Sequence, residues 1–221
     1  MNVTEALLIR KSVRAFLDQD VTYEQIIKIL NYAKHAPSGT NTQPWQVAVV
    51  SGNKKSELDK SLLDAFNNNI PRTMDYNYYP DVLSPEFKAR RLACGLQMFK
   101  TLNIAREDKE QRAYQWGLNY SAFGAPVVLY FFADKRIDKG SYIDMGMFMQ
   151  SVMLMACELG LATCAQASLA EYADIVKDLL GYPKDLILLC GMAIGYEDVT
   201  APINSYRTHR EEVLSFTKFF E

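Results

Sequence analysis

The chain contains one unusually polar connector, Ala36-Pro37-Ser38-Gly39-Thr40-Asn41-Thr42-Gln43-Pro44-Trp45, between a helical pattern and an apolar strand pattern. Its two prolines fix φ and remove two backbone donors, and Gly39 has access to conformations closed to other residues. A simple turn does not require so many polar groups, an aromatic side chain and two rigid points. Loops on a rigid scaffold often carry binding groups. The connector is therefore either part of a binding site or a polar turn anchored by Trp45, and its own residues leave both interpretations open.

Hydrophobic spacing around this connector favours an α+β fold. Apolar residues at helical spacing predict a first helix over 4–16, and Thr22-x-x-Gln25 resembles a capping box that begins a second helix. Further helices are predicted around 58–66, after Ser84-Pro85, over 145–160, and from Ser168-x-x-Glu171 to Gly181. Strands are predicted at 46–51, 127–132 and 186–194. Strands so far apart in sequence favour a central, mixed but mainly antiparallel sheet flanked by helices.

Length and charge limit the function classes. The 221 residues, 49% of them hydrophobic, are sufficient for one large core in a single domain spanning 1–221. The net charge is −2 and no long basic run occurs, so we expect no nucleic acid and no membrane surface as a partner. Basic residues interrupt any signal-peptide pattern near the N-terminus, and the longest apolar run, 186–194, is far below the roughly 20 residues of a membrane helix. We therefore expect a cytoplasmic protein.

The four cysteines do not predict a metal site. No CxxC pair is present and the chain has only two histidines. Cys94, Cys157 and Cys190 lie among apolar residues and are interpreted as small core side chains in a reducing compartment. Cys164 lies in a loop-like context and is the one cysteine expected to differ from them.

A tyrosine-rich segment, residues 67–85, follows the third predicted helix. It has no clear periodicity, and long connections of this type are usually functional lids. Together with the helices that follow it, it forms an expected lid-like excursion over about 67–117. The C-terminal tail, 203–221, ends in several apolar residues that must be covered by the chain itself or by a partner.

Arginines stand out at both ends of the chain. Arg10 and Arg14 are four residues apart and would share one face if the first helix continued through them. They form either a solvated basic face or a phosphate clamp completed by Ser12. Arg207 and Arg210 repeat the feature near the C-terminus. Arginines, an amide-rich loop and many aromatic residues suit a flat, phosphorylated aromatic ligand, and flavin mononucleotide (FMN) fits that description.

No hydrolase, zinc-protease, Walker A or dinucleotide-binding signature is present. Instead, five motifs in order resemble the FMN-dependent nitroreductase family, and two smaller segments resemble its nitrobenzoate-reductase-like subgroup. The family motifs are Arg10-Lys11-Ser12-Val13-Arg14, Pro37 to Trp45, Gly160-Leu161-Ala162-Thr163-Cys164, Gly191 to Tyr196, and Arg207-Thr208-His209-Arg210. The subgroup segments are Ala165-Gln166-Ala167 and the region of Tyr79-Pro80 and Arg90-Arg91.

The resemblance implies an intertwined homodimer with one FMN in each of two interface sites. It implies that the phosphate and ribityl chain are surrounded by Arg10, Lys11, Ser12, Arg207 and Arg210. Arg14 would lie near the N1/O2 edge of the flavin, Pro37, Ser38, Gly39 and Asn41 would come from the other subunit, and Gln166 and Ala167 would lie beside the ring. The tail 203–221 would pack on the partner subunit. Family members often have other residues at Gln166 and Ala167, and the covering aromatic could be Tyr78, Tyr79, Tyr120 or Phe123.

The implied activity is ping-pong hydride transfer through flavin N5 from NADH or NADPH to a small aromatic substrate, a nitroaromatic or quinone-like acceptor. The flavin carries the chemistry, which agrees with the absence of an acid–base dyad in the sequence. Flavin fragmentation or reductive dehalogenation on the same scaffold remains an alternative. Two further alternatives are a non-catalytic flavin-binding protein and a colourless structural dimer.

Overall fold

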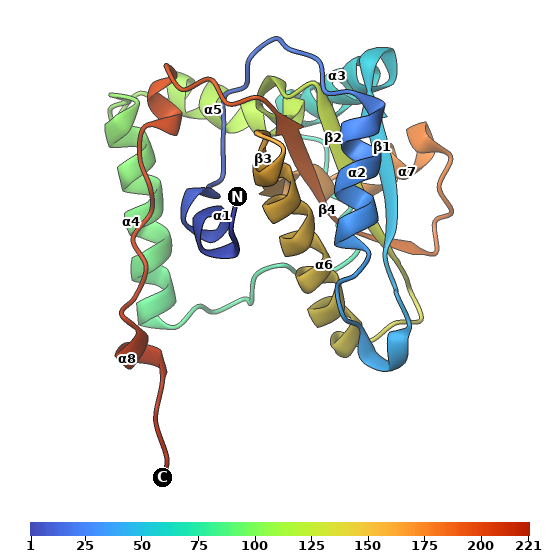
Figure 1. The fold of residues 1–221 in the computed structure, drawn as a ribbon. Helices are drawn as coiled ribbons and strands as arrows, with labels where there is room; N and C mark the ends of the chain where they lie inside the picture. The colour runs from blue at the N-terminus through green and yellow to red at the C-terminus, as the bar shows by residue number, and fades with distance from the viewer.

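The computed structural model describes residues 1–221 and is built on a four-stranded antiparallel sheet with the order β1-β2-β4-β3 (Figure 1). The strands are β1 (Gln46–Ser51), β2 (Val127–Asp134), β3 (Ala162–Gln166) and β4 (Leu186–Gly195). The two central strands, β2 and β4, are buried almost throughout, which explains why both are continuous apolar runs in the sequence. One isolated parallel bridge, between Ser12 and Thr163, is the only parallel pairing. The predicted α+β class is confirmed.

Helices cover both faces of the sheet. The α-helices are α1 (Val3–Ile9), α2 (Tyr23–Ala33), α3 (Gly52–Asn67), α4 (Pro85–Thr101), α5 (Lys109–Gly117), α6 (Lys139–Glu158), α7 (Ala173–Leu180) and α8 (Val213–Phe216). Short 3-10 turns are η1 (Gly39–Asn41), η2 (Leu118–Gly124), η3 (Ala167–Ala170) and η4 (Pro202–Asn204). Successive residues of β2 point to opposite faces. Leu129 and Phe131 pack with α2 and α6, whereas Val128 and Tyr130 pack with α3, α7 and η2.

The first helix is shorter than the sequence spacing predicts. It ends at Ile9, and Arg10 already has an extended ψ of 123°. The chain then runs beside β3, where the backbone N–H of Val13 donates to the carbonyl of Thr163 at 3.0 Å. The prediction of a helix over 4–16 is wrong, and so is the shared helical face of Arg10 and Arg14, because pairing with the sheet edge overrides the local helical pattern.

The predicted helix starts have mixed outcomes. Thr22 and Gln25 form the expected reciprocal capping box, and Ser84 caps α4 with Pro85 at its first position. The capping box at Ser168 is wrong. The Ser168 hydroxyl donates to the Asn119 side chain at 3.2 Å, and α7 begins only at Ala173.

Two cysteine predictions are also wrong. Cys94 is exposed, because no residue of α4 is buried. Cys164 does not lie in a loop but is buried in β3, and burial raises the pKa of its thiol. Cys157 and Cys190 are buried as predicted. No group of three or more metal-ligating side chains occurs in the chain.

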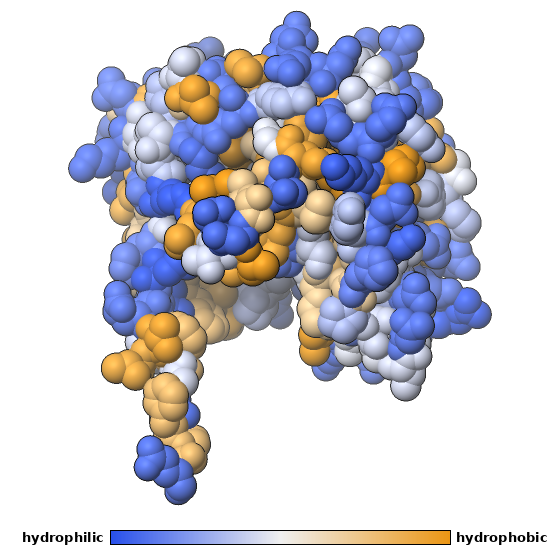
Figure 2. All heavy atoms as spheres, viewed as in Figure 1, coloured by the Kyte–Doolittle hydropathy of each residue, from blue (hydrophilic) through white to orange (hydrophobic).

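Two segments protrude from the sheet layers. The helix α4 and the C-terminal tail run side by side away from the body of the chain (Figure 1). The tail exposes Phe216, Phe219 and Phe220, and α1 exposes Leu7 and Leu8. Figure 2 shows hydrophobic surface along the protruding tail. None of the helices combines the length and apolar character that crossing a membrane requires.

Candidate functional site

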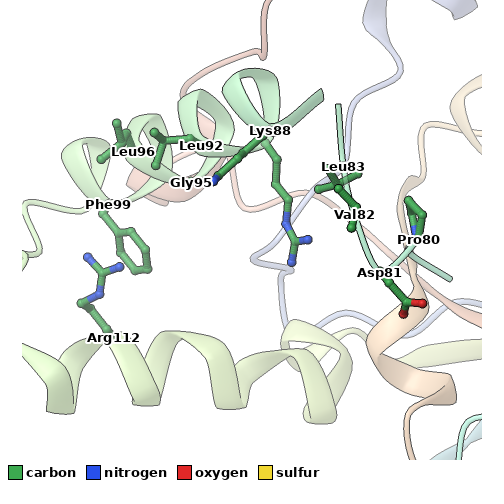
Figure 3. Close-up of a pocket in the computed structure, with 11 residues that line it drawn as sticks. Pro80, Asp81, Val82, Leu83, Lys88, Leu92, Gly95, Leu96, Phe99 and Arg112 are labelled. Atoms are coloured by element: carbon green, nitrogen blue, oxygen red, sulfur yellow. The ribbon is translucent and has the colours of Figure 1, made fainter. Parts of the chain in front are cut away.

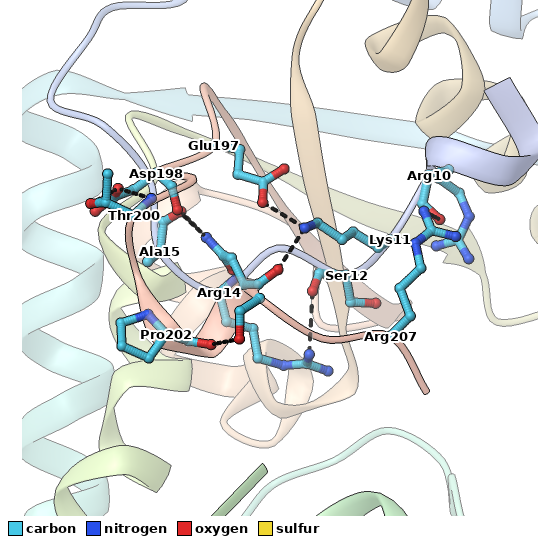
Figure 4. A network of polar contacts seen from close by, with 12 residues as sticks. Arg10, Lys11, Ser12, Arg14, Ala15, Glu197, Asp198, Thr200, Pro202 and Arg207 are labelled. Atoms are coloured by element: carbon cyan, nitrogen blue, oxygen red, sulfur yellow. Dashed lines mark hydrogen bonds and ion pairs between the residues drawn. The ribbon is translucent and has the colours of Figure 1, made fainter. Parts of the chain in front are cut away.

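Cationic residues from the two ends of the chain line one cavity of about 240 Å³. Its walls include Arg10, Lys11, Ser12, Arg14, Arg207, Thr208 and Arg210. The Arg207 guanidinium donates to the carbonyl of Arg10 at 3.1 Å, so the tail and the segment after α1 are in direct contact (Figure 4). The structure thus brings together all of the predicted phosphate-binding residues. We call this group the arginine cluster.

The charges of the arginine cluster are not balanced by carboxylates. Lys11 forms an ion pair with Glu197 at 2.7 Å, but Arg10, Arg14, Arg207 and Arg210 form none. Arginine forks without a carboxylate partner are suited to bidentate binding of phosphate oxygens. The arrangement therefore fits an anionic ligand group better than a merely solvated basic surface.

Asn204 fixes the backbone of this cluster. Its Oδ1 accepts from the N–H of Arg14 at 2.8 Å, and its Nδ2 donates to the carbonyls of Ala15 and Asp198, both at 2.9 Å. Its carbonyl accepts from the ammonium of Lys11 at 2.6 Å. Sequence reasoning missed Asn204, because a single asparagine after a proline-containing turn carries no pattern that distinguishes it from a surface residue.

The polar connector is anchored near the N-terminal end of α6. The N–H of Gly39 donates to Asp144 at 3.2 Å, and the Ser38 hydroxyl accepts from the N–H of Gln43 at 3.0 Å. Trp45 stacks on Phe148 with ring centroids 4.7 Å apart. Trp45 is therefore the predicted anchor, and the connector also keeps Pro37, Gly39 and Asn41 exposed.

The connector and the arginine cluster do not meet within one chain. The connector contacts α6 at Asp144, whereas Arg10 and Cys157 line a common cavity near the end of the same helix. Those two positions are 13 residues apart on α6 (157 minus 144), which corresponds to roughly 20 Å at 1.5 Å per residue. Residues 37–41 of the same chain are therefore remote from the cluster.

The turn at Gln166 and Ala167 is fixed from inside the protein. The Gln166 side chain is buried, and its Nε2 donates to the carbonyl of Asn119 at 3.0 Å. Below the turn, Leu169 packs so closely on β4 that a Cβ on Gly191 would lie 2.5 Å from it. A ligand at this turn would consequently meet backbone rather than the Gln166 amide. Asn119, like Asn204, carried no signal in the sequence.

Comparison with known proteins agrees with this geometry. The model of the Nitroreductase family matches residues 7–196. The chain belongs to the nitroreductase family. This nitroreductase-family chain is 38% identical over 210 residues to a 4-nitrobenzoate reductase of Pseudomonas putida, covering 95% of the chain and 92% of that protein.

Two solved structures have the same fold over their full length. The FMN and NADPH-dependent nitroreductase NfnB from Sphigopyxis sp. strain HMH superposes with a TM-score of 0.96 at 36% identity, covering 100% of both chains. The FMN-dependent nitroreductase NfnB from Mycobacterium smegmatis, in complex with NADPH, superposes with a TM-score of 0.93 at 32% identity, also covering 100% of both chains.

The tyrosine-rich segment of this nitroreductase-family chain, residues 67–85, is anchored over its first half. Asp75 accepts from the buried ammonium of Lys177 at 2.6 Å and from the N–H of Leu188 at 2.8 Å. The Tyr76 hydroxyl donates to the carbonyl of Leu189 at 2.6 Å, and burial raises its pKa. These contacts occupy the part of β4 that β3 is too short to pair.

The structure narrows the candidates for an aromatic that covers a ligand. Tyr120 and Phe123 are buried in the core, so their proposed role over a flavin is wrong. Tyr120 instead donates to Glu171 at 2.5 Å, which joins η2 to η3. Tyr78 and Tyr79 are each 52% exposed and lie beyond the last anchor of the segment.

Proposed function

We propose that this chain is an FMN-dependent NAD(P)H oxidoreductase that reduces nitroaromatic or quinone-like acceptors, with one FMN-binding domain over residues 1–221. The observation that carries the proposal is the arginine cluster, in which four arginines from both ends of the chain line one cavity without a carboxylate partner. The names of the relatives support the reaction class, since they include a 4-nitrobenzoate reductase and FMN- and NADPH-dependent nitroreductases.

The donor set of the cluster fits FMN. Arg10, Ser12, Arg207 and Arg210 supply guanidinium and hydroxyl donors for the phosphate and ribityl chain. Lys11 is held by Glu197 and the Asn204 carbonyl, so it adds positive charge to the site and fixes the backbone beside it. When bound, FMN accepts a hydride from NAD(P)H and passes it to the acceptor.

Arg14, Gln166 and Ala167 are the residues proposed to contact the flavin ring. Arg14 is placed by Asn204 and by its own Nη1 contact to the Ser12 carbonyl at 3.3 Å, and a guanidinium at the N1/O2 edge favours negative charge there. The backbone of Gln166 and Ala167 would lie beside the flavin ring, since the Gln166 side chain is turned inward. No acid–base dyad is required.

We further propose that the functional unit is an intertwined homodimer. The connector lies roughly 20 Å from the arginine cluster of its own chain. In a dimer, its residues Pro37, Ser38, Gly39 and Asn41 would instead approach the arginine cluster of the second copy. The exposed apolar faces of α1 and of the tail 203–221 supply the surface that such a dimer would bury.

Steady-state kinetics test the reaction. The purified protein is expected to oxidise NADPH or NADH with nitrobenzene or a quinone, and double-reciprocal plots at several acceptor concentrations should be parallel. The Arg14→Ala variant should remain folded, bind FMN more weakly and turn over more slowly. Unchanged flavin content and rate in this variant would contradict the role of Arg14.

Other outcomes identify the alternatives. A yellow protein that fails to oxidise NAD(P)H with any of these acceptors would be a flavin-binding protein without reductase activity. Consumption of the flavin itself, or release of halide from a halogenated aromatic without nitro reduction, would assign another reaction on the same scaffold.

A further inference from the structure

A second, larger cavity lies on the other side of α4 from the arginine cluster. It has a volume of about 640 Å³ and lies between α4, α5 and residues 80–83 (Figure 3). On one side of α4, Gln97 donates to the carbonyl of Arg207 at 3.2 Å and Arg90 pairs with Glu211 at 2.8 Å. The cavity is bordered by the opposite side of the helix, including Arg91 and Gly95. The helix α4 therefore separates the two sites by about its own diameter, roughly 10 Å.

The walls of this cavity combine apolar surface with unpaired positive charge. The apolar part consists of Val82, Leu83, Leu92, Leu96 and Phe99. Lys88, Arg91 and Arg112 contribute three positive charges, and Asp81 contributes one negative charge. None of the three cations forms an ion pair in the structure. The cavity thus retains an excess of positive charge beside a surface suited to an aromatic ring.

The two guanidinium groups are held over aromatic rings. The Arg112 guanidinium lies 3.8 Å from the centroid of the Phe99 ring, and that of Arg91 lies 4.3 Å from the Tyr79 ring. Figure 3 shows Phe99 and Arg112 facing each other across the gap between α4 and α5. A guanidinium that stacks by its face keeps its N–H edge free for a carboxylate or a phosphate. Both arginines are therefore prepared to bind an anion.

We propose that this cavity binds the anionic group of a planar aromatic ligand used by the reductase. The proposal rests on the proposed function and extends it to the class of ligand. Two sources supply this chemistry: the carboxylate of a carboxylated nitroaromatic acceptor, and the 2′-phosphate of NADPH. Leu92 and Phe99 offer apolar surface to an aromatic ring, while Arg91 and Arg112 bind the charge.

Paired substrates that differ in one anionic group separate the two sources. We would measure kcat/KM for 4-nitrobenzoate and nitrobenzene, and for NADPH and NADH, in Arg91→Met, Arg112→Met and the double variant. Methionine keeps the apolar stem and removes the charge. The matched control is Arg136→Met, since Arg136 is exposed and pairs only with Asp134. All assays use low ionic strength, because salt screens exposed charges.

The expected result is a fall of about tenfold in one of the two ratios in the double variant, consistent with loss of a charge-assisted hydrogen bond. A fall in the ratio of 4-nitrobenzoate to nitrobenzene assigns the acceptor carboxylate. A fall in the ratio of NADPH to NADH assigns the 2′-phosphate. Ratios within twofold of wild type in both pairs would overturn the proposal.

Calorimetric titration gives a readout that does not depend on turnover. Benzoate and 2′,5′-ADP serve as charged probes, with benzamide and 5′-AMP as their counterparts that lack the tested anionic group. The double variant should weaken one charged probe about tenfold relative to its counterpart. Equal affinities in wild type and variant would overturn the proposal. A wild-type protein inactive with nitrobenzene and both nucleotides would instead contradict the proposed function, and the titration would still decide the binding site.

Discussion

Substitution of Asn204 tests whether this side chain holds the arginine cluster together. Asn204 is 2% exposed and makes three side-chain hydrogen bonds, to the N–H of Arg14 and to the carbonyls of Ala15 and Asp198. Asn204→Ala removes all three and leaves three backbone groups without these partners. At about 1 kcal/mol net for each bond, the free energy of unfolding should fall by about 3 kcal/mol. For a chain of this length that corresponds to a decrease of roughly 6–12 °C in Tm.

The assay is urea unfolding of the flavin-free protein, followed by circular dichroism at one protein concentration. The midpoint should fall while the slope m stays constant, since the substitution does not change the surface exposed on unfolding. Asn204→Asp keeps the acceptor for Arg14 but places a carboxylate against two carbonyl oxygens, so it should be at least as destabilising as alanine.

The control is Asn31→Ala, which removes an exposed contact to the Lys34 ammonium at 3.2 Å. This change should stay within about 0.5 kcal/mol of wild type. The Asn204 variant should also bind FMN about tenfold more weakly, because Arg14 loses its backbone support. An Asn204→Ala variant that resembles Asn31→Ala in both stability and FMN affinity would show that Asn204 does not hold the arginine cluster together.

Three further substitutions test other parts of the structure. Gly191→Ala should lower stability by about 1–3 kcal/mol, because the added Cβ would lie 2.5 Å from Leu169; a melting curve that matches wild type would contradict this packing. Lys177→Met should cost about 3–5 kcal/mol, because it leaves the Asp75 carboxylate, whose side chain is 19% exposed, without its cation, and the double variant with Asp75→Asn should recover part of the loss in urea unfolding. Asn119→Ala should shift the visible spectrum of bound flavin and lower its affinity, since the turn loses the Asn119 Oδ1 that accepts from Ser168 at 3.2 Å and from Gln166 at 3.4 Å; an unchanged spectrum and affinity would exclude that role.

The parts of the fold that could be predicted are those whose sequence pattern matches a local physical requirement. The run from Val127 to Phe132 is continuous because β2 is covered on both faces. Thr22 and Gln25 fit a capping box because that bond is local. The arginines could be grouped before their positions were known, because they stand in motifs at both ends of the chain that resemble those of one family.

The failures arise where a distant partner decides the local structure. The segment 10–14 has a helical pattern, but Val13 pairs with Thr163 and the chain is extended there. Ser168 and Glu171 have capping-box spacing, yet their side chains bond to Asn119 and Tyr120 instead. The contacts of Asn119 are to residues 47–49 positions away, and two of the three side-chain contacts of Asn204 are to residues 189–190 positions away. A short stretch of sequence therefore does not contain both members of these pairs.

The proposal that the arginine cluster binds FMN is tested most directly by the flavin content of the protein purified without added cofactor. The arginine cluster predicts a yellow protein from which FMN is released on denaturation, at one molecule per chain. An Arg10→Ala, Arg207→Ala variant should retain its fold and lose most of that FMN. A colourless wild-type protein that binds no added FMN would contradict the claim, as would a yellow protein whose flavin content is unchanged in this variant.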